Sequence, residues 1–267
     1  MSQEGRSPLP GLSRVLIGMV HLRPLPGSPR WDGSLEAVVE RAVADARAIA
    51  AGGFQACLVE NFGDAPFSPG AVDPATVAAM AVVVAEVRRA LPLPVGVNVL
   101  KNDAQAALAV AAATGAAFVR VNVHVGAVVA DQGLIQGDAY RTLRYRRLLG
   151  TATRLFVDVG GKHAVPLAPA EPSQVARDAA YRGLADALVV SGAATGEPTP
   201  LDDVTRVRAA VPDRPILVGS GVTPDTVREL LAVADGAIVG TWIKEGGRAA
   251  NPVDPDRVAA LARALRR

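Results

Sequence analysis

Short apolar runs alternate with longer amphipathic segments along the whole chain. The short runs are rich in Val, Ile and Leu and have the length of buried β-strands, whereas the segments between them have helical periodicity. The expected strands cover residues 15–20, 55–60, 95–100, 117–124, 154–159, 186–191, 216–219 and 236–240. The expected helices lie near residues 35–51, 73–90, 103–114, 138–149, 173–183, 201–210, 224–233 and 254–265.

Strands that alternate with helices pair in parallel, and the helices make the crossover connections. Eight such units in about 250 residues match the size of a closed barrel. An open doubly wound sheet is the alternative, but no Gly-x-Gly-x-x-Gly motif follows the first strand. The sequence therefore predicts an α/β protein with one (β/α)8 TIM barrel over residues 15–267, preceded by a flexible segment over residues 1–14.

Residues that commonly cap helices support these boundaries. The N-cap candidates are Ser34, Asp73, Asn102 and Thr223, the first-turn prolines are Pro74 and Pro224, and the C-terminal glycines are Gly52, Gly53, Gly115 and Gly183. No linker or shift in composition divides the chain, which favours a single domain.

Polar residues interrupt the fourth expected strand at every second position. Because side chains alternate along a strand, Arg120, Asn122 and His124 are expected to point into the barrel and the valines between them towards the helices. Burying these polar groups costs several kcal/mol unless each is paired or binds a polar ligand. A structural ion-pair network is the alternative to a functional role.

Other strands also end in polar residues, at the face where barrels carry their active sites. The candidate catalytic residues are Glu60, Asn98, Lys101, Arg120, Asn122, His124, Asp158, Lys162 and His163. All three histidines of the chain, His21 included, lie at or just past a strand end. The set is compatible with acid–base catalysis and with a divalent metal, but no tight ligand spacing assigns any residue to a metal.

Glycine-rich turns follow the last strands. Glycines let backbone N–H groups approach an anion, and barrels often hold phosphate in the loops after strands seven and eight. The candidate phosphate-binding residues are Gly192, Thr195, Gly219, Ser220, Gly221, Gly240 and Thr241. The alternative is that Gly219 and Gly221 only form tight turns. The loop at residues 126–137 is long enough to act as a lid, and a surface loop without a functional role is the alternative.

Composition narrows the class of protein. The chain has 267 residues, of which 50% are apolar and 20% charged, so it can form a core and is not disordered. The net charge of +2 is dispersed, which does not favour nucleic-acid binding. No long apolar stretch predicts an integral membrane segment. The chain has a single cysteine, Cys57, which we predict to be a core residue. Because it cannot form a disulfide within the chain, we expect a cytoplasmic protein. The sequence is also compatible with a homo-oligomer, since barrels of this kind often form dimers.

Several motifs resemble those of the BtpA family, from about residue 15 to residue 265. They are GMVHLRPLPGSP at 18–29, ENFGDAPF at 60–67, GVNVLKND at 96–103, FVRVNVH at 118–124 and KHAVPL at 162–167, with the segments 192–199 and 218–223. The resemblance implies a barrel of the ribulose-phosphate-binding type. Members of the family are described as biogenesis factors for membranes or photosystems and as enzymes, so it implies no single reaction.

The leading hypothesis is an enzyme that acts on a phosphorylated sugar or nucleotide-like metabolite by proton transfer or a lyase-type step. Glu60, Asp158 and His124 are the candidate proton carriers, and Lys162 is an electrostatic group or forms an imine. In this hypothesis, Asn98, Arg120 and Asn122 orient the substrate or stabilise the negative charge that develops on it. Two alternatives stay open: a non-catalytic assembly factor for a membrane complex such as a photosystem, and a metal-dependent hydrolase. The sequence assigns no cofactor.

Overall fold

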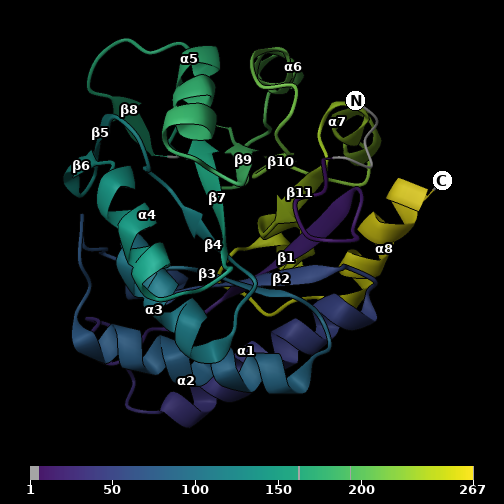
Figure 1. The fold of residues 1–267 in the computed structure, drawn as a ribbon. Coiled ribbons are helices and arrows are strands. Elements are labelled where there is room, and N and C mark those ends of the chain that lie inside the picture. Colours follow the sequence, from purple (N-terminus) through teal and green to yellow (C-terminus); the bar gives the residue numbers. More distant parts are fainter. Residues whose placement is uncertain (1–5, 162, 193, 267) are drawn as a thin grey trace.

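The computed structural model describes residues 6–161, 163–192 and 194–266, and eight of its strands close into a parallel barrel. Figure 1 shows this ring with the helices around it. The barrel strands are β1 (Val15–His21), β2 (Ala56–Glu60), β3 (Val95–Asn98), β4 (Phe118–Val121), β7 (Arg154–Val159), β9 (Ala187–Val190), β10 (Ile216–Val218) and β11 (Gly236–Val239). They neighbour one another in this order, and β11 pairs with β1 to close the ring. The predicted (β/α)8 TIM barrel is confirmed.

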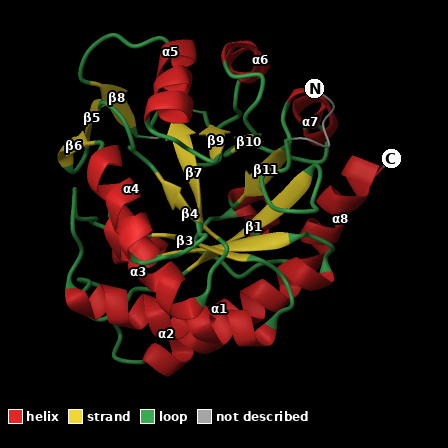
Figure 2. Cartoon of the chain, in the orientation of Figure 1, coloured by secondary structure: helices red, strands yellow, loops and turns green. Residues whose placement is uncertain are grey.

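A helix follows each barrel strand and lies outside the ring (Figure 2). The helices are α1 (Leu35–Ala51), α2 (Pro74–Ala90), α3 (Ala104–Thr114), α4 (Ala139–Leu148), α5 (Pro172–Arg177), α6 (Leu201–Ala210), α7 (Val227–Val233) and α8 (Pro255–Arg266). A π-helical turn at Asp178–Arg182 continues α5. None of the described helices is both long and apolar enough to cross a membrane.

Two of the predicted N-caps are wrong. Asp103, not Asn102, caps α3 by accepting a hydrogen bond from the backbone N–H of Ala106. The Asn102 side chain instead bonds both backbone groups of Val123, at 2.8 Å each. Helix α7 begins at Val227, because residues 224–226 form a turn before it, and its N-cap is therefore not Thr223. Local capping rules do not anticipate these competing contacts.

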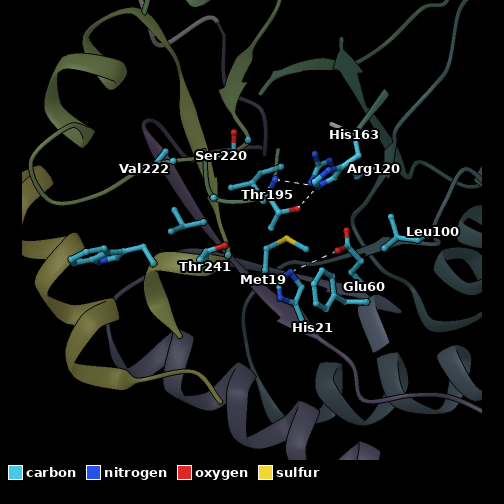
Figure 3. Close-up of a pocket in the computed structure, with 18 of the residues that line it drawn as sticks. Met19, His21, Glu60, Leu100, Arg120, His163, Thr195, Ser220, Val222 and Thr241 are labelled. Carbon is cyan, nitrogen blue, oxygen red and sulfur yellow. Dashed lines mark hydrogen bonds and ion pairs between the residues drawn. The ribbon is translucent and has the colours of Figure 1, made fainter. Parts of the chain in front are cut away.

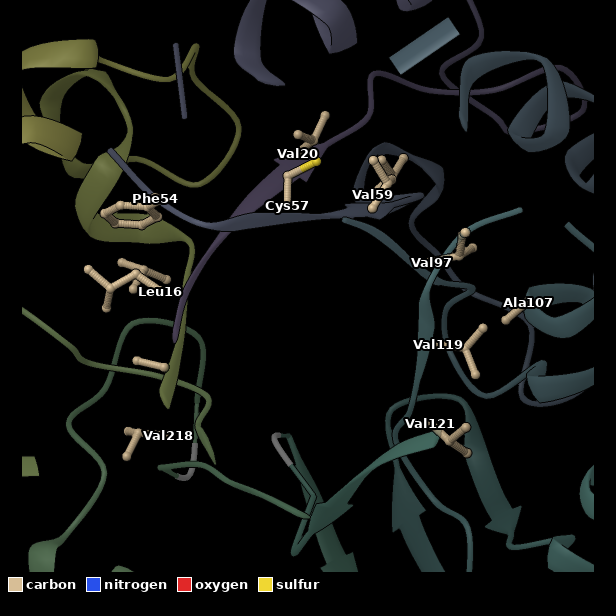
Figure 4. Packing of buried hydrophobic residues seen from close by; sticks show 14 of the residues in the cluster. Leu16, Val20, Phe54, Cys57, Val59, Val97, Ala107, Val119, Val121 and Val218 are labelled. Carbon is tan, nitrogen blue, oxygen red and sulfur yellow. The ribbon is translucent and has the colours of Figure 1, made fainter. Parts of the chain in front are cut away.

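Apolar side chains alternate between two layers. The outward side chains, among them Val20, Val59, Val97, Val119 and Val121, pack beneath the helices (Figure 4). The prediction that the β4 valines face the helices is thus confirmed. Cys57 belongs to this layer. Burial raises the pKa of its thiol to about 12, so the side chain stays protonated and apolar in character.

The inward apolar side chains form the floor of the barrel interior. The Phe118 and Phe156 rings stack there, with centroids 4.5 Å apart. Gly96 on β3 makes room for them, because a Cβ at this position would lie 2.2 Å from the Phe118 ring. Burying one such side chain stabilises the fold by about 1.5–3 kcal/mol.

Residues 6–14 close the N-terminal end of the barrel. We expected a flexible segment over residues 1–14, but Leu9 is buried in the interior apolar cluster. Arg154, at the start of β7, donates to the backbone oxygens of Ser7 and Pro8 at 3.2 and 3.1 Å. The apolar base of the barrel needs a cover against water, and Leu9 provides it.

The expected lid loop at residues 126–137 is a β-hairpin. Its strands β5 (Ala127–Ala130) and β6 (Gly133–Gln136) form a three-stranded sheet with β8 (Ala164–Pro166), in the order β6-β5-β8. Ile135 is buried on the inner face of this sheet. Val129 pairs with Leu134 and Val165 across the sheet, and all three side chains are exposed.

Candidate functional site

The last inward positions of the barrel strands form a polar layer above the apolar floor. His21, Glu60, Asn98, Arg120 and Asp158 are the last inward positions of β1, β2, β3, β4 and β7. Ser191, Gly219 and Gly240 directly follow β9, β10 and β11 and complete the layer. A pocket of about 490 Å³ opens at this C-terminal face. In Figure 3, Glu60, Leu100, Arg120 and His163 lie on one side of the pocket, and Val222 and Thr241 lie on the other.

Most of the predicted site residues meet at this pocket. The lining includes Glu60, Lys101, Arg120, Asn122, His163, Thr195, Gly219, Ser220, Gly221, Gly240 and Thr241. Asn98, Asp158 and Gly192 do not line it but contact residues that do. Lys162 lies outside the described residues. The hairpin of β5 and β6 contributes no lining residue, so the pocket offers no support for a lid there.

Arg120 and Asp158 form a buried ion pair. Nε and Nη2 of Arg120 each donate to one oxygen of Asp158 at 2.9 Å, and Asn122 Nδ2 donates to the same carboxylate at 2.9 Å. Burial acts to lower the pKa of Arg120, but the charge and hydrogen bonds of Asp158 outweigh it and raise that pKa. Arg120 lines the pocket and Asp158 does not, so the guanidinium group lies between the pocket and the carboxylate.

Glu60 and His21 lie side by side at the ends of β2 and β1. Asn98 Nδ2 donates to Glu60 Oε2 at 2.6 Å, and Glu60 Oε1 lies 3.7 Å from Nε2 of His21. The other ring nitrogen, Nδ1, lies 2.8 Å from the backbone oxygen of Ala249. The His21 ring also stacks on Phe62, with the centroids 4.4 Å apart. One carboxylate and one imidazole are thus oriented towards the same pocket.

His124 does not join the site, contrary to our expectation. Strand β4 ends at Val121, so the period-two alternation no longer applies at residue 124. The His124 ring is buried and lies 2.8 Å, through Nε2, from the backbone oxygen of Gly183. Burial lowers the pKa of this histidine, which favours the neutral ring. These contacts give His124 a structural environment away from the pocket.

Two loops line the opposite side of the pocket, one after β10 and one after β11. Ser220 joins the first loop to the β9–α6 connection, because its Oγ accepts from Gly192 N at 2.7 Å and its backbone oxygen accepts from Thr199 at 3.0 Å. Within the described residues, no hydrogen bond engages the backbone N–H groups of Gly221, Val222 or Thr241. Backbone N–H groups of residues that line a pocket can donate hydrogen bonds to the oxygens of an anion.

Sequence reasoning omitted several lining residues from the candidate set. His21 carried a signal, since it ends β1, and it is the partner of Glu60. Arg257 carried none, because it lies in α8, far past the last strand. Its Nε donates to the backbone oxygen of Trp242, and its guanidinium carbon lies 4.2 Å from the centre of the Trp242 ring. Both Trp242 and Arg257 line the pocket beside the β11 loop.

No group of three or more His, Cys, Asp or Glu side chains among residues 6–161, 163–192 and 194–266 is arranged to hold a metal ion. The pocket lining contains one carboxylate and two histidines, with Lys101 and Arg257 as cations besides Arg120, whose charge is balanced by Asp158. This balance of charge suits an anionic ligand.

Solved structures with a similar fold cover nearly the whole chain. KGPDC from Streptococcus mutans superposes with a TM-score of 0.59 at 11% identity, covering 96% of this chain and 98% of that one. Phosphoribosyl anthranilate isomerase from Thermus thermophilus gives 0.56 at 14% identity, covering 94% and 98%. At such low identity these likenesses show the (β/α)8 barrel fold alone.

Relatives in sequence are more similar and cover nearly the whole chain. The photosystem I biogenesis protein BtpA of Synechocystis is 46% identical over 250 residues, which span 94% of this chain and 87% of that protein. The sgc region protein SgcQ of Escherichia coli is 34% identical over 252 residues, 93% of each chain. The model of the BtpA family matches residues 12–267. The chain therefore belongs to the BtpA family.

Proposed function

We propose that the protein is an enzyme that binds a small phosphorylated metabolite and moves a proton on it with Glu60 and His21. The observation that carries this proposal is the occurrence, in one pocket, of an anion-binding wall and an acid–base pair. The pocket volume of about 490 Å³ is in the range of small-molecule sites, at about 300–1,000 Å³.

The anion-binding wall consists of the N–H groups of Gly221, Val222 and Thr241. They supply hydrogen bonds to phosphate oxygens, and Arg257 adds a positive charge beside them. Because Arg120 is neutralised by Asp158, it orients the ligand rather than adding net charge. A phosphorylated sugar or nucleotide-like compound fits this division into an anionic end and a reacting end.

The proton-transfer groups lie across the pocket from this wall. A backbone oxygen only accepts hydrogen bonds, so Nδ1 of His21 carries the proton that Ala249 binds. Nε2 is therefore the ring nitrogen that faces Glu60, and it is the one that can take up or release a proton in the pocket. Asn98 holds Glu60 in place, so that the carboxylate can remove a proton from the ligand and return it.

The test combines a binding screen with one isosteric substitution. A phosphorylated metabolite at about 100 times its Kd adds about 2.7 kcal/mol of stability, which raises the melting temperature by several degrees. In Glu60→Gln the new amide keeps the bond from Asn98 and donates to His21, so the fold and ligand binding persist. Turnover of the bound compound should fall about 100- to 10,000-fold.

Glu86→Gln is the matched control, because Glu86 is a carboxylate on the surface of α2 that pairs with Arg89. It should leave both binding and turnover unchanged. If no phosphorylated compound stabilises the protein, the phosphate wall is wrong. If Glu60→Gln turns over a bound compound at the original rate, the acid–base assignment is wrong.

A non-catalytic assembly role is the second candidate, and the sheet β6-β5-β8 favours it. Val129, Leu134 and Val165 expose an apolar face there, and Leu167 is also exposed. Exposed apolar patches often mark protein contacts, and a relative at 46% identity is named as a photosystem I biogenesis protein. Co-purification of a stoichiometric membrane complex that is lost in Leu134→Ser would support this role.

A further inference from the structure

The segment from Lys244 to Val253, here called the 244–253 loop, lies between the pocket and helix α1. Its two ends form an antiparallel β-bridge, and Glu245 N donates to Pro252 O at 2.9 Å. Asn251 closes it further, because its Nδ2 donates to Glu245 O at 2.9 Å. The loop is therefore a compact unit, and its position depends on what holds its two ends.

A single carboxylate holds both ends. Asp45 lies on α1, and its side chain is 2% exposed. Its Oδ2 accepts from Lys244 Nζ at 3.2 Å, and its Oδ1 accepts from Val253 N at 2.8 Å. Lys244 is fully buried, so this ion pair is shielded from water. Arg41 adds a third bond to Asp45 from the side of α1.

The middle of the same loop contacts the proposed proton-transfer pair. Ala249 O accepts the hydrogen bond from Nδ1 of His21 at 2.8 Å, and Gly247 lines the pocket. The hydrogen-bond partner of one ring nitrogen determines the protonation of the other. The position of the 244–253 loop thus decides which ring nitrogen of His21 carries the proton when the ring is neutral.

We infer that Asp45 is a positioning residue, which sets the tautomer of His21 through the 244–253 loop. Asp45 does not line the pocket, so it acts on the ligand only through this loop. For catalysis the inference rests on the proposed role of His21, but the tautomer is measured without any ligand. No local motif joins residue 45 to residue 249, because the connection passes through bonds between distant parts of the chain.

The experiment is NMR of the imidazole nitrogens in the ¹⁵N-labelled full chain. The protein has three histidines, and the signals of His21 are assigned by their loss in His21→Gln. The wild-type protein should show His21 protonated at Nδ1. In Asp45→Asn the loop loses the charge that binds Lys244, so His21 should exchange between both tautomers while His124 keeps its signals.

Arg41→Ala is the matched control, because it removes a partner of Asp45 that does not belong to the loop. It should leave the His21 signals unchanged. Asn251→Ala loosens the loop from its partly exposed side, and it provides the same test if Asp45→Asn does not fold. In Asn251→Ala, too, the His21 ring should exchange between both tautomers.

A His21 ring that keeps its Nδ1 proton in folded Asp45→Asn or Asn251→Ala would overturn the inference. The outcome is separate from that of the proposed function. A protein that binds no phosphorylated compound but shows the tautomer change would refute the function and keep the positioning role. If the wild-type protein binds and turns over a phosphorylated ligand but the His21 tautomer is unchanged in the variants, the proposed function is kept and the positioning role of Asp45 is refuted.

Discussion

Gly221→Ala is the substitution that most directly tests the phosphate wall. Gly221 has a φ of +67°, and a Cβ there would lie 2.3 Å from Pro198 Cα and 2.5 Å from Glu197 O. Both are backbone atoms, so the two loops must move apart. The left-handed backbone costs alanine about 1–2 kcal/mol. The movement also strains the two hydrogen bonds of Ser220, each worth about 1 kcal/mol. The expected loss of stability is therefore about 3–4 kcal/mol.

Gly126→Ala is the matched control for this loss. Gly126 has a nearly equal φ of +71°, but a Cβ there meets no atom within 4 Å. Its substitution should cost only the backbone term of about 1–2 kcal/mol. The difference of about 2 kcal/mol corresponds to a further drop in melting temperature of about 4–8 °C. Urea unfolding followed by circular dichroism measures both variants.

The same pair of variants tests ligand binding by calorimetry with inorganic phosphate. Displacing the N–H groups of residues 221 and 222 should remove more than one hydrogen bond to a charged group and weaken binding at least about tenfold. Gly126→Ala should bind as the wild-type protein does. Equal stabilities for the two variants would refute the steric argument, and equal phosphate affinities would refute the placement of the anion at Gly221.

Two further predictions concern buried charges. In Arg120→Met, Asn122 is the only described residue that still donates a hydrogen bond to the buried Asp158 side chain. The substitution should therefore destabilise the protein by about 3–5 kcal/mol in urea unfolding, and adding Asp158→Leu should recover part of this loss. A loss below about 1 kcal/mol would contradict it. Burial lowers the pKa of Lys244 to about 8 despite the nearby Asp45. The unfolded chain then binds more protons above pH 8, so the free energy of unfolding should rise with pH from about 8 to about 10.5, and Lys244→Met should flatten this rise.

The sequence by itself determined the barrel and the composition of its polar layer. Apolar runs of strand length followed by helical segments permit few other folds. Within a strand the side-chain period is two, so the inward positions of Arg120 on β4 and Asp158 on β7 follow from their neighbours. Glycines after β10 and β11 predicted the two loops to which we assign anion binding in our proposal, because the ends of adjacent parallel strands meet at one face.

Tertiary structure alone decided what lies beyond the strand ends. His124 follows β4 and turns to Gly183, because the alternation ends with the strand. Arg257 reaches the pocket from α8. The Ala249 oxygen reaches His21 across 228 positions of the chain. Loop side chains are placed by contacts between residues far apart in sequence, and these contacts have no period that can be read along the chain. The strands therefore supply the polar layer, whereas the folded loops select which of its groups face one another.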